Sequence, residues 1–547
     1  MRIAVACGKD GGGTLRPVDD AGAPAGPAER VADLVAAIAE RERALAPRWV
    51  WPSTARLYPR LLRAGVRVAR CHDLELVETL LLNHDGRYGE PRSVRAAWAR
   101  LRGAPVPPDP APPDALPQPS LFDDAETGGA GGADADDIDQ IVEVHAAQRR
   151  RSAGLDGFAL LAAAESAGAL AAAEMGHDGL PWSAERHDAL LTELLGPRPS
   201  GGLRPRRLQE LADRIGEAFG RRVNPDSPAQ IVKAFAAAGL TVPSTRAHVL
   251  KGLDHPAVPL LLEYKELSRL YTAHGWTWLD TWVSGGRFRP EYVVGGVVSG
   301  RWATNGGGAL QIPRVLRRAV VADPGWALVV ADAAQLEPRV LAALAGDRAF
   351  ARAAAQGDLY SALADAFGGD RGKAKIALLS AMYGGGTGEA VQLLAVLKNR
   401  FPEAFGFVES AARAGERGHL VRSLLGRTCP PPSPEWRALT AEGGERAAAA
   451  VRSRGRFTRN FVVQATAADW ALVLLATLRR RLAELGPPRL VFFQHDEVIV
   501  HTPRELAERV GAAVRASAEE AGRLLFGRTP VVFPMEIAAV DCYADAK

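Results

Sequence analysis

The chain has 547 residues, of which 47% are hydrophobic and 24% charged, which is ordinary for a soluble globular protein and too long for a single hydrophobic core. Its 67 lysines and arginines nearly balance its 63 aspartates and glutamates, which excludes a uniformly basic protein, so any surface that binds nucleic acid has to be local. The four scattered cysteines argue against a disulfide framework and a CxxC metal site, and the lack of any run near 18 apolar residues argues against a membrane-spanning segment. We therefore expect a cytoplasmic protein with reduced thiols.

The first 102 residues mix short apolar runs with arginine-rich helical patterns, and this mixture predicts a small α/β domain. The composition then changes, because eight prolines lie between Pro105 and Pro119 and are followed by Gly, Ala and Asp. Such a stretch buries too little apolar surface to form a core, so residues 103–136 are predicted to be a linker.

The chain is predicted to be mainly helical from about residue 137 to 300, with EYVVGGVVSG at 291–300 as the exception. Strands and helices alternate after that. The predicted elements are a strand ALVVAD (327–332), a helix EPRVLAALAG (337–346), a helix RGKAKIALLSAMYGG (371–385), a long helix after Asn460, and a hairpin of RLVFFQ and EVIVHT. This order implies a sheet that carries functional groups at its edge and has a large helical insertion between its strands.

Two aspartates are predicted to end strands of this sheet. Asp332 leaves a wholly apolar strand, where a carboxylate is poorly solvated unless it faces a cleft or a cation. Asp496 shares the tight hairpin connection with His495; a simple β-turn is the alternative interpretation, although glycine or asparagine would suit it better. If the two aspartates meet, they would hold two divalent ions about 4 Å apart. Hard oxygen ligands and phosphate substrates favour Mg²⁺.

The segment 371–385 places Arg371, Lys375, Leu379 and Tyr383 four residues apart. On a helix these side chains share one face over roughly 18 Å. Only eight of the 67 basic residues are lysines, so a lysine at 375 indicates a role that arginine fulfils less well, such as a compact phosphate ligand. A solvated amphipathic face is the alternative.

A second polar stripe consists of Arg456, Asn460 and Gln464, again four residues apart. These side chains are donors suited to the minor-groove N3 and O2 acceptors that every base pair presents. Contacts of this kind would test for a paired duplex without reading its sequence. A polar cluster at the start of a helix is the alternative.

Taken together, these segments resemble DNA polymerase family A, of the DNA polymerase I (Klenow-fragment) type. The resemblance runs in chain order through SGRWAT with LQIPR (299–314), DAAQLEPR (332–339), RGKAKIALLSAMYG (371–384), RFTRNFVVQATAAD (456–469) and QHDEV (494–498). It implies an α+β multidomain fold, in which a right-hand polymerase follows a small α/β exonuclease-like (RNase H-like) domain. The implied divisions are the exonuclease-like domain (1–102), the linker (103–136), connecting helices and the start of the palm (137–182), the thumb (183–265), the palm (266–336 and 456–547) and the fingers (337–455).

The resemblance also implies the activity: addition of dNTPs to a primer 3' end on a DNA template, by two-metal phosphoryl transfer with two Mg²⁺ ions, in repair or replication. The implied metal ligands are Asp332 and Asp496. The implied nucleotide contacts are Arg371, Lys375 (also catalytic), Leu379, Tyr383, Gln335 and Glu337, of which Glu337 would be the steric gate that excludes a ribose 2'-hydroxyl. The implied primer and template contacts are Arg301, Arg456, Asn460, Gln464 and His495.

The chain departs from the family pattern at several positions. Ala333 and Ala334 replace a Tyr-Ser pair, Leu379 replaces an aromatic residue, and Tyr360 stands where the family usually has histidine. In the exonuclease-like domain no Asp-x-Glu follows the first strand, so we expect no 3'-5' exonuclease activity. Two alternatives stay open: a catalytically weak DNA-binding protein on the same fold, and a phage-type single-subunit RNA polymerase, against which Glu337 argues.

The predicted linker contains QPSLF, which is similar to the short Q-x-x-L-F peptides that dock bacterial replication proteins onto the sliding clamp. The residues that would make this contact are Gln118, Leu121 and Phe122. The expected partners are therefore primer-template DNA, dNTPs and, through this peptide, a sliding clamp. We expect a monomer that is associated with the nucleoid in the cytoplasm and has no membrane partner.

Overall fold

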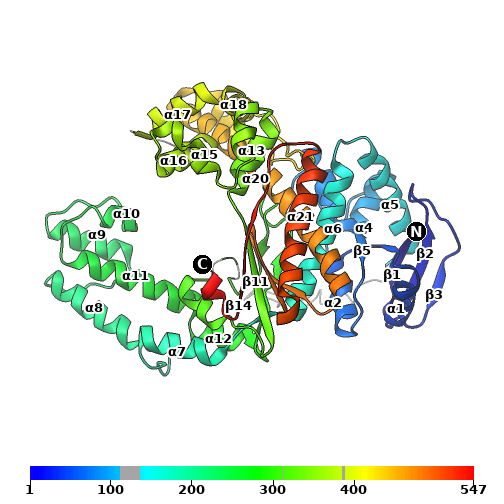
Figure 1. Cartoon of the computed structure of the whole chain (residues 1–547), viewed down its shortest axis with the longest axis horizontal. Helices are drawn as coiled ribbons and strands as arrows, with labels where there is room; N and C mark the ends of the chain where they lie inside the picture. Colours follow the sequence, from blue (N-terminus) through cyan, green and yellow to red (C-terminus); the bar gives the residue numbers. More distant parts are fainter. Residues whose placement is uncertain (111–135, 309, 311, 385–388, 547) are drawn as a thin grey trace.

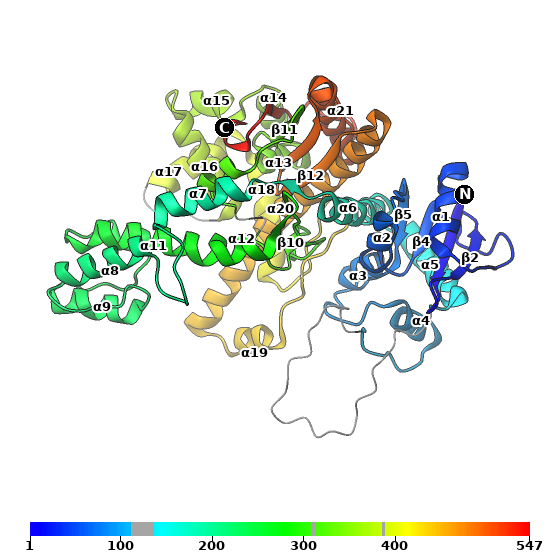
Figure 2. The ribbon, with the colours of Figure 1, turned by 90° about the horizontal axis from the view of Figure 1, so that it is seen from below.

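The computed structural model describes residues 1–110, 136–308, 310, 312–384 and 389–546. The clamp-like peptide at Gln118–Phe122 lies outside the described residues. Figure 1 shows the central sheet in the middle of the molecule and the N-terminal strands at one end. The helices α8 (Arg206–Ala218) to α11 (Ala257–His274) lie at the other end, and the helices α15 (Leu359–Leu363) to α18 (Pro402–Glu416) lie beyond one end of the central strands. Figure 2 gives the same order of parts from below.

The N-terminal sheet has the strand order β3-β2-β1-β4-β5. β1 is antiparallel to β2 and parallel to β4, which is parallel to β5, and the buried rings of Trp49 and Trp51 fill the core beneath it. An α/β fold was predicted for this region and is observed. Its elements are β1 (Arg2–Cys7), β2 (Gly13–Val18), β3 (Glu29–Val31), α1 (Leu34–Leu45), β4 (Arg48–Trp51), α2 (Thr54–Arg63), β5 (Arg70–Asp73), α3 (Leu74–His84) and α4 (Val94–Arg102).

Two helices join this region to the rest of the chain. α5 (Ile138–Ala153) packs on the N-terminal sheet through Ile141, Val142 and Val144, whereas α6 (Phe158–Asp178) packs against both α2 and the central helices. The domain boundaries inferred from the sequence stay predictions.

The helices that follow α6 form a separate helical arm. They are α7 (Ala184–Leu195), α8 (Arg206–Ala218), α9 (Pro228–Ala237), α10 (Ala247–Leu250), α11 (Ala257–His274) and α12 (Trp276–Trp282). Short strands connect the arm to the centre: β6 (Leu180–Pro181), β7 (Val283–Ser284), β8 (Arg287–Phe288), β9 (Tyr292–Val293) and β10 (Ala303–Thr304). The run predicted to be β-like at 291–300 forms only the two-residue strand β9. The chain turns after this strand because Gly295 and Gly300 have positive φ angles.

The central sheet is antiparallel, with the strand order β12-β13-β11-β14. Its strands are β11 (Trp326–Ala333), β12 (Arg489–Gln494), β13 (Glu497–Pro503) and β14 (Met535–Val540), which confirms the predicted strand and hairpin. Alternate residues of β11 face opposite cores: Val329 and Ala331 belong to one hydrophobic cluster, and Leu328 and Val330 belong to another. Both faces of the sheet are therefore covered, and functional groups are left to its ends.

The helical insertion lies between β11 and β12, as predicted. It consists of α13 (Leu336–Ala345), α14 (Arg348–Ala354), α15 (Leu359–Leu363), α16 (Arg371–Tyr383), α17 (Glu389–Arg400), α18 (Pro402–Glu416), α19 (Pro434–Glu442) and α20 (Gly444–Leu485). The helix α21 (Ala507–Phe526) and the 3-10 helices η2 (Arg314–Ala319), η3 (Ala364–Phe367), η4 (Arg504–Leu506) and η5 (Tyr543–Ala546) complete the fold. Asp370 caps α16 by accepting from the amide of Lys373, and Gly384 ends it in the left-handed region.

The prediction that a long helix begins near Asn460 is wrong about its start, since α20 begins at Gly444. The residues before Asn460 are rich in alanine and arginine, which favour helix. The helix continues through Gly455, where α18 packs closely against it. A Cβ on Gly455 would lie 2.7 Å from an oxygen of Glu416, so this close contact requires glycine. Asn460 and Gln464 consequently lie in the middle of a 42-residue helix rather than at its first turn.

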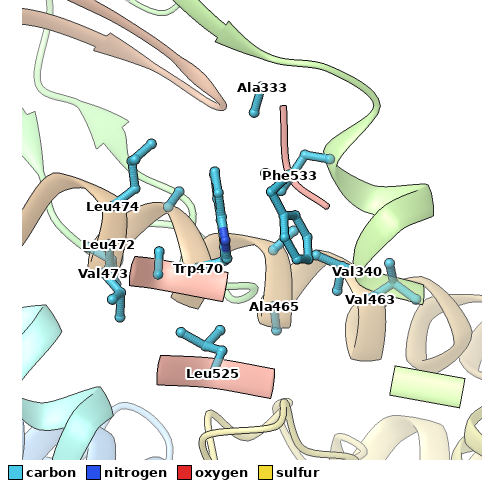
Figure 3. Packing of buried hydrophobic residues seen from close by; sticks show 14 of the residues in the cluster. Ala333, Val340, Val463, Ala465, Trp470, Leu472, Val473, Leu474, Leu525 and Phe533 are labelled. Atoms are coloured by element: carbon cyan, nitrogen blue, oxygen red, sulfur yellow. The ribbon is translucent and has the colours of Figure 1, made fainter. Parts of the chain in front are cut away.

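Within the described ranges, two helices, α6 and α20, are long and apolar enough to cross a membrane by length and composition alone. However, 72% and 89% of their most apolar windows are buried inside the protein, which is typical of core helices. Figure 3 shows part of this packing, where the ring of Trp470 on α20 stacks on Phe533 with 5.4 Å between ring centroids. The expectation that the protein has no membrane partner stays a prediction.

Candidate active site

Asp332 and Asp496 lie side by side at one end of the central sheet. Asp332 on β11 pairs in register with Glu497, the first residue of β13, and the amide of Ala333 donates to the carbonyl oxygen of Asp496 over 3.1 Å. On the other side of β11, Asp332 pairs with Glu536 of β14. The structure thus places the backbones of the two predicted aspartates next to each other, with two glutamates on the neighbouring strands, and their joint role as metal ligands stays a prediction.

The donor set at this sheet end suits a hard divalent ion. The described residues contain no group of three or more His, Cys, Asp or Glu side chains arranged to hold a metal by themselves. Mg²⁺ is commonly held by one or two carboxylates, with water and substrate phosphates completing the octahedron. Asp332 and Asp496 fit that pattern, in which the protein supplies part of the coordination and the substrate supplies the rest.

Strained backbone flanks both aspartates. Among the described residues, three that are not glycine have a positive φ, and two of them are Gln335 at 57° and His495 at 59°. Such a conformation costs about 1–2 kcal/mol and concentrates at functional sites. His495 lies at the hairpin tip, and partial desolvation of its ring together with the nearby Arg301 lowers its pKa, which favours the neutral imidazole with one donor and one acceptor nitrogen.

Glu337 contacts two other predicted site residues. Its carboxylate forms an ion pair with Arg301 and accepts a hydrogen bond from the hydroxyl of Tyr383. Burial and this hydrogen bond raise the pKa of Tyr383, so the phenol stays a proton donor at neutral pH. The carboxylate of Glu337 therefore joins three segments: the first turn of α13, the loop before η2 and the last turn of α16.

Gln335 and Arg371 meet at Asp358, a residue that the sequence did not single out. Asp358 accepts from Gln335 Nε2 over 2.8 Å and from Arg371 Nε over 2.7 Å, and it caps α15 by accepting from the amides of Tyr360 and Ser361. Burial alone would raise the pKa of Asp358, but the hydrogen bonds from Arg371, Ser361 and Gln335 hold it well below its ordinary value. The guanidinium of Arg371 also lies 5.5 Å from the ring centroid of Tyr360.

The predicted stripe on α16 faces outward. Arg371, Lys375 and Tyr383 are exposed, and Leu379 is half-buried against the main hydrophobic cluster, while the opposite face is buried through Ala374 and other small or apolar residues. The amphipathic helix inferred from the spacing is therefore confirmed, but the structure alone does not distinguish a phosphate-binding face from a solvated one.

The stripe on α20 lies close to the end of α16. A Cβ on Gly384 would lie 3.1 Å from Cγ of Arg456, and a hydrogen bond from Gln464 partly offsets the raised pKa of Tyr383. The Oδ1 atom of Asn460 is buried and has no hydrogen-bond partner within the described part of the chain. The two predicted stripes thus share one region beside Glu337.

Two buried groups of the site were missed by the sequence reasoning. Arg339 is fully buried and donates to five backbone carbonyls that hold the turn after Asp332, those of Ala334, Ala354, Gln356, Gly357 and Val532. Glu497, adjacent to Asp496, is buried and accepts from the hydroxyl of Tyr543. The sequence did contain a signal for each residue. Arg339 is an arginine inside an apolar helix, and Glu497 is a second acid beside the hairpin tip.

Comparison with known proteins identifies the family of this site. The family model described as DNA polymerase family A matches residues 204–539, more than half of the chain. The chain is 29% identical over 328 residues to the thermostable DNA polymerase I of Thermus thermophilus, covering 54% of this chain and 37% of that protein. It is 29% identical over 307 residues to DNA polymerase I of Chloroflexus aurantiacus, covering 50% and 31%. The matches thus span about a third of the length of these curated relatives.

A solved structure shares the fold along nearly the whole chain. It is the POL domain of Pol1 from M. smegmatis in complex with DNA primer-template and dNTP, which matches with a TM-score of 0.71 at 18% identity and covers 99% of this chain and 95% of that one. The likeness confirms the predicted polymerase fold class. Together with the family match over residues 204–539, it shows that the chain belongs to DNA polymerase family A.

Proposed function

We propose that the protein is a DNA-directed DNA polymerase that adds dNTPs to a primer 3' end. The observation that carries the proposal is the meeting of Asp332 and Asp496 at one sheet end, with the outward cationic face of α16 in the helical insertion beyond it. Carboxylates for metal ions and cations for a triphosphate are the two requirements of a phosphoryl-transfer site. Membership of DNA polymerase family A supports the same reading.

Asp332 and Asp496 would hold two Mg²⁺ ions, which lower the pKa of the primer hydroxyl and neutralise the leaving pyrophosphate when they are bound. Arg371 and Lys375 would hold the triphosphate, with Lys375 placed as the catalytic cation. The ion pair between Arg371 and Asp358 supports this role, because it keeps the guanidinium at the N-terminal end of the α16 face, and the triphosphate would compete with Asp358 for it.

Glu337 would act as the steric gate and Tyr383 would line the nascent base pair. The hydroxyl of Tyr383 and the guanidinium of Arg301 both contact the carboxylate of Glu337, which supports this role because a fixed carboxylate would exclude a ribose 2'-hydroxyl better than a mobile one. Arg301, together with His495 and the α20 stripe of Arg456, Asn460 and Gln464, would contact primer and template in the minor groove.

We also propose that the N-terminal domain has no 3'-5' exonuclease activity, because β1 reads RIAVAC and carries no Asp-x-Glu. The polymerase would act as a monomer in repair or replication, in the cytoplasm with the nucleoid. Recruitment to a sliding clamp through Gln118, Leu121 and Phe122 stays a prediction that clamp binding by the isolated peptide can test.

Primer extension tests the main proposal. The purified chain is expected to extend a primer on a DNA template with dNTPs, to prefer them over rNTPs, and to need a divalent ion. Asp332→Ala and Asp496→Ala should each abolish extension, while Asp365→Ala, an acid of η3, serves as the matched control. Extension that survives either aspartate substitution would overturn the two-metal assignment, and no extension by the unmodified chain would favour the DNA-binding alternative.

A further inference from the structure

A buried ion triad lies beneath the loop that carries Arg301. Arg427, whose side chain is only 6% exposed, donates through Nε to Asp469 over 2.8 Å and through Nη2 to Glu165 over 2.7 Å. The three residues come from the loop after α18, from α20 and from α6. The planar guanidinium is therefore fixed by two carboxylates at once, a geometry that arginine provides and lysine does not.

The loop rests directly on this guanidinium. Gly300 has a φ of +84°, and a Cβ built on it would lie 2.5 Å from Cζ of Arg427, so no larger residue fits without moving one of them. Gly295, at the other side of the same loop, would place a Cβ 2.6 Å from an oxygen of Glu165. Both glycines allow the backbone to approach the triad at van der Waals distance.

The same loop leaves Arg301 little freedom. A turn closes just before it, since the amide of Gly300 donates to Val297 over 2.8 Å and the amide of Val297 donates to the carbonyl of Arg301 over 3.0 Å. Trp302, the next residue, is buried edge-on against Phe493 of β12. Arg301 is thus held between a glycine seated on Arg427 and a buried tryptophan, and its side chain reaches Glu337.

We propose that Arg427 is a positioning residue for the pair of Arg301 and Glu337, and through that pair for discrimination between deoxyribonucleotides and ribonucleotides. This inference rests on the proposed function and deepens it. The triad fixes the position of the loop backbone, and the loop backbone fixes the position of the Arg301 guanidinium. That guanidinium in turn orients the gate carboxylate of Glu337. Arg427 itself is buried away from any nucleotide and acts only through the loop.

Arg427→Lys tests the proposal, because it keeps the charge and loses the planar, two-carboxylate contact. We expect the ratio of kcat/KM for dNTP to kcat/KM for rNTP to fall about tenfold. The matched control is Arg479→Lys, a second buried arginine, which pairs with Glu174 and donates to the carbonyls of Val68 and Ala69 in the N-terminal domain. It should lower the unfolding temperature to a similar extent and leave the ratio unchanged.

Gly300→Ala disturbs the same contact between the loop and Arg427, but it changes the loop and keeps every charge of the triad. It should lower the ratio as Arg427→Lys does, and the double variant should lose less than the product of the two single effects, because both act on one contact. If Arg427→Lys does not fold, Gly300→Ala decides the question alone. An unchanged ratio in folded Arg427→Lys or Gly300→Ala overturns the inference, whereas failure of the unmodified chain to extend a primer overturns the proposed function instead.

Discussion

The hydroxyl of Tyr383 donates a hydrogen bond to the carboxylate of Glu337, and this bond joins the last turn of α16 to the first turn of α13. The carboxylate is also paired with Arg301, so it has a cation on one side and a phenol on the other. Two partners fix the direction of a short side chain far better than one does, which is what exclusion of a single hydroxyl group requires.

The first prediction concerns this carboxylate. Glu337→Ala removes the bulk of the proposed gate, and we expect the ratio of kcat/KM for dNTP to kcat/KM for rNTP to fall by at least about tenfold, equivalent to about 1.4 kcal/mol. Tyr383→Phe leaves the pair of Arg301 and Glu337 and should give a smaller fall in the same ratio. Tyr271→Phe on α11 is the control. A ratio that Glu337→Ala leaves intact would show that another group excludes the ribose.

A second prediction concerns Asp358 and pH. The pKa of Asp358 is lowered in the folded protein by Arg371, Ser361 and Gln335, so its carboxylate stabilises the fold fully above the unfolded-state pKa of about 3.9. That stabilisation is lost as the pH falls below this value toward the folded-state pKa. The difference in free energy of unfolding between the unmodified chain and Asp358→Asn should therefore be constant from pH 7 to about pH 5 and shrink below about pH 4.

Urea unfolding followed by circular dichroism at several pH values measures this difference. Asp545→Asn, an acid in η5 at the far end of the chain, is the control variant. A difference that grows as the pH falls would contradict the assigned direction of the pKa shift. Because the side chain of Asp358 is 38% exposed, solvent screening should keep the effect small.

These predictions rest partly on residues that local sequence pattern identifies and partly on residues that it does not. The strand ending at Asp332, the hairpin tip at Asp496 and the face of α16 were predictable, since each depends on periodicity within one short segment. Arg427 was not, because its two acids lie 262 and 42 residues away in the sequence. The start of α20 was missed because Gly455 suggests a break until the close contact with α18 is known.

A third prediction concerns the N-terminal domain, which several contacts tie firmly to α6 and α20. Arg479 on α20 donates to the carbonyls of Val68 and Ala69 and pairs with Glu174 on α6. In addition, Leu80 and Leu81 of α3 belong to the same hydrophobic cluster as Trp470. Deleting residues 1–102 should therefore expose a large apolar surface and give an aggregated or unfolded protein rather than a smaller active polymerase.

Size-exclusion chromatography and thermal unfolding of the truncated chain measure this outcome, with the full chain as reference. A monomeric truncated protein with an unchanged unfolding temperature would contradict it. For the same reason, exonuclease activity is better assayed in the full-length Asp332→Ala variant, where polymerisation is expected to be absent and the N-terminal domain is intact. We expect no Mg²⁺-dependent degradation of single-stranded DNA by this variant.

The last prediction concerns Leu379, the residue of the α16 face where the resemblance to the family pattern implies an aromatic ring. Leu379 is half-buried against the main hydrophobic cluster, so part of a ring placed there would still face outward beside Lys375 and Tyr383. Leu379→Phe should lower the KM for dNTP several-fold, because stacking of a ring on the incoming nucleotide contributes up to about 1 kcal/mol. The kcat should change little, since the proposed metal ligands and Lys375 are untouched. Steady-state primer extension measures both constants, and Leu379→Met, which changes shape without adding a ring, is the matched control. Equal KM values for the phenylalanine and methionine variants would show that this position does not contact the nucleotide.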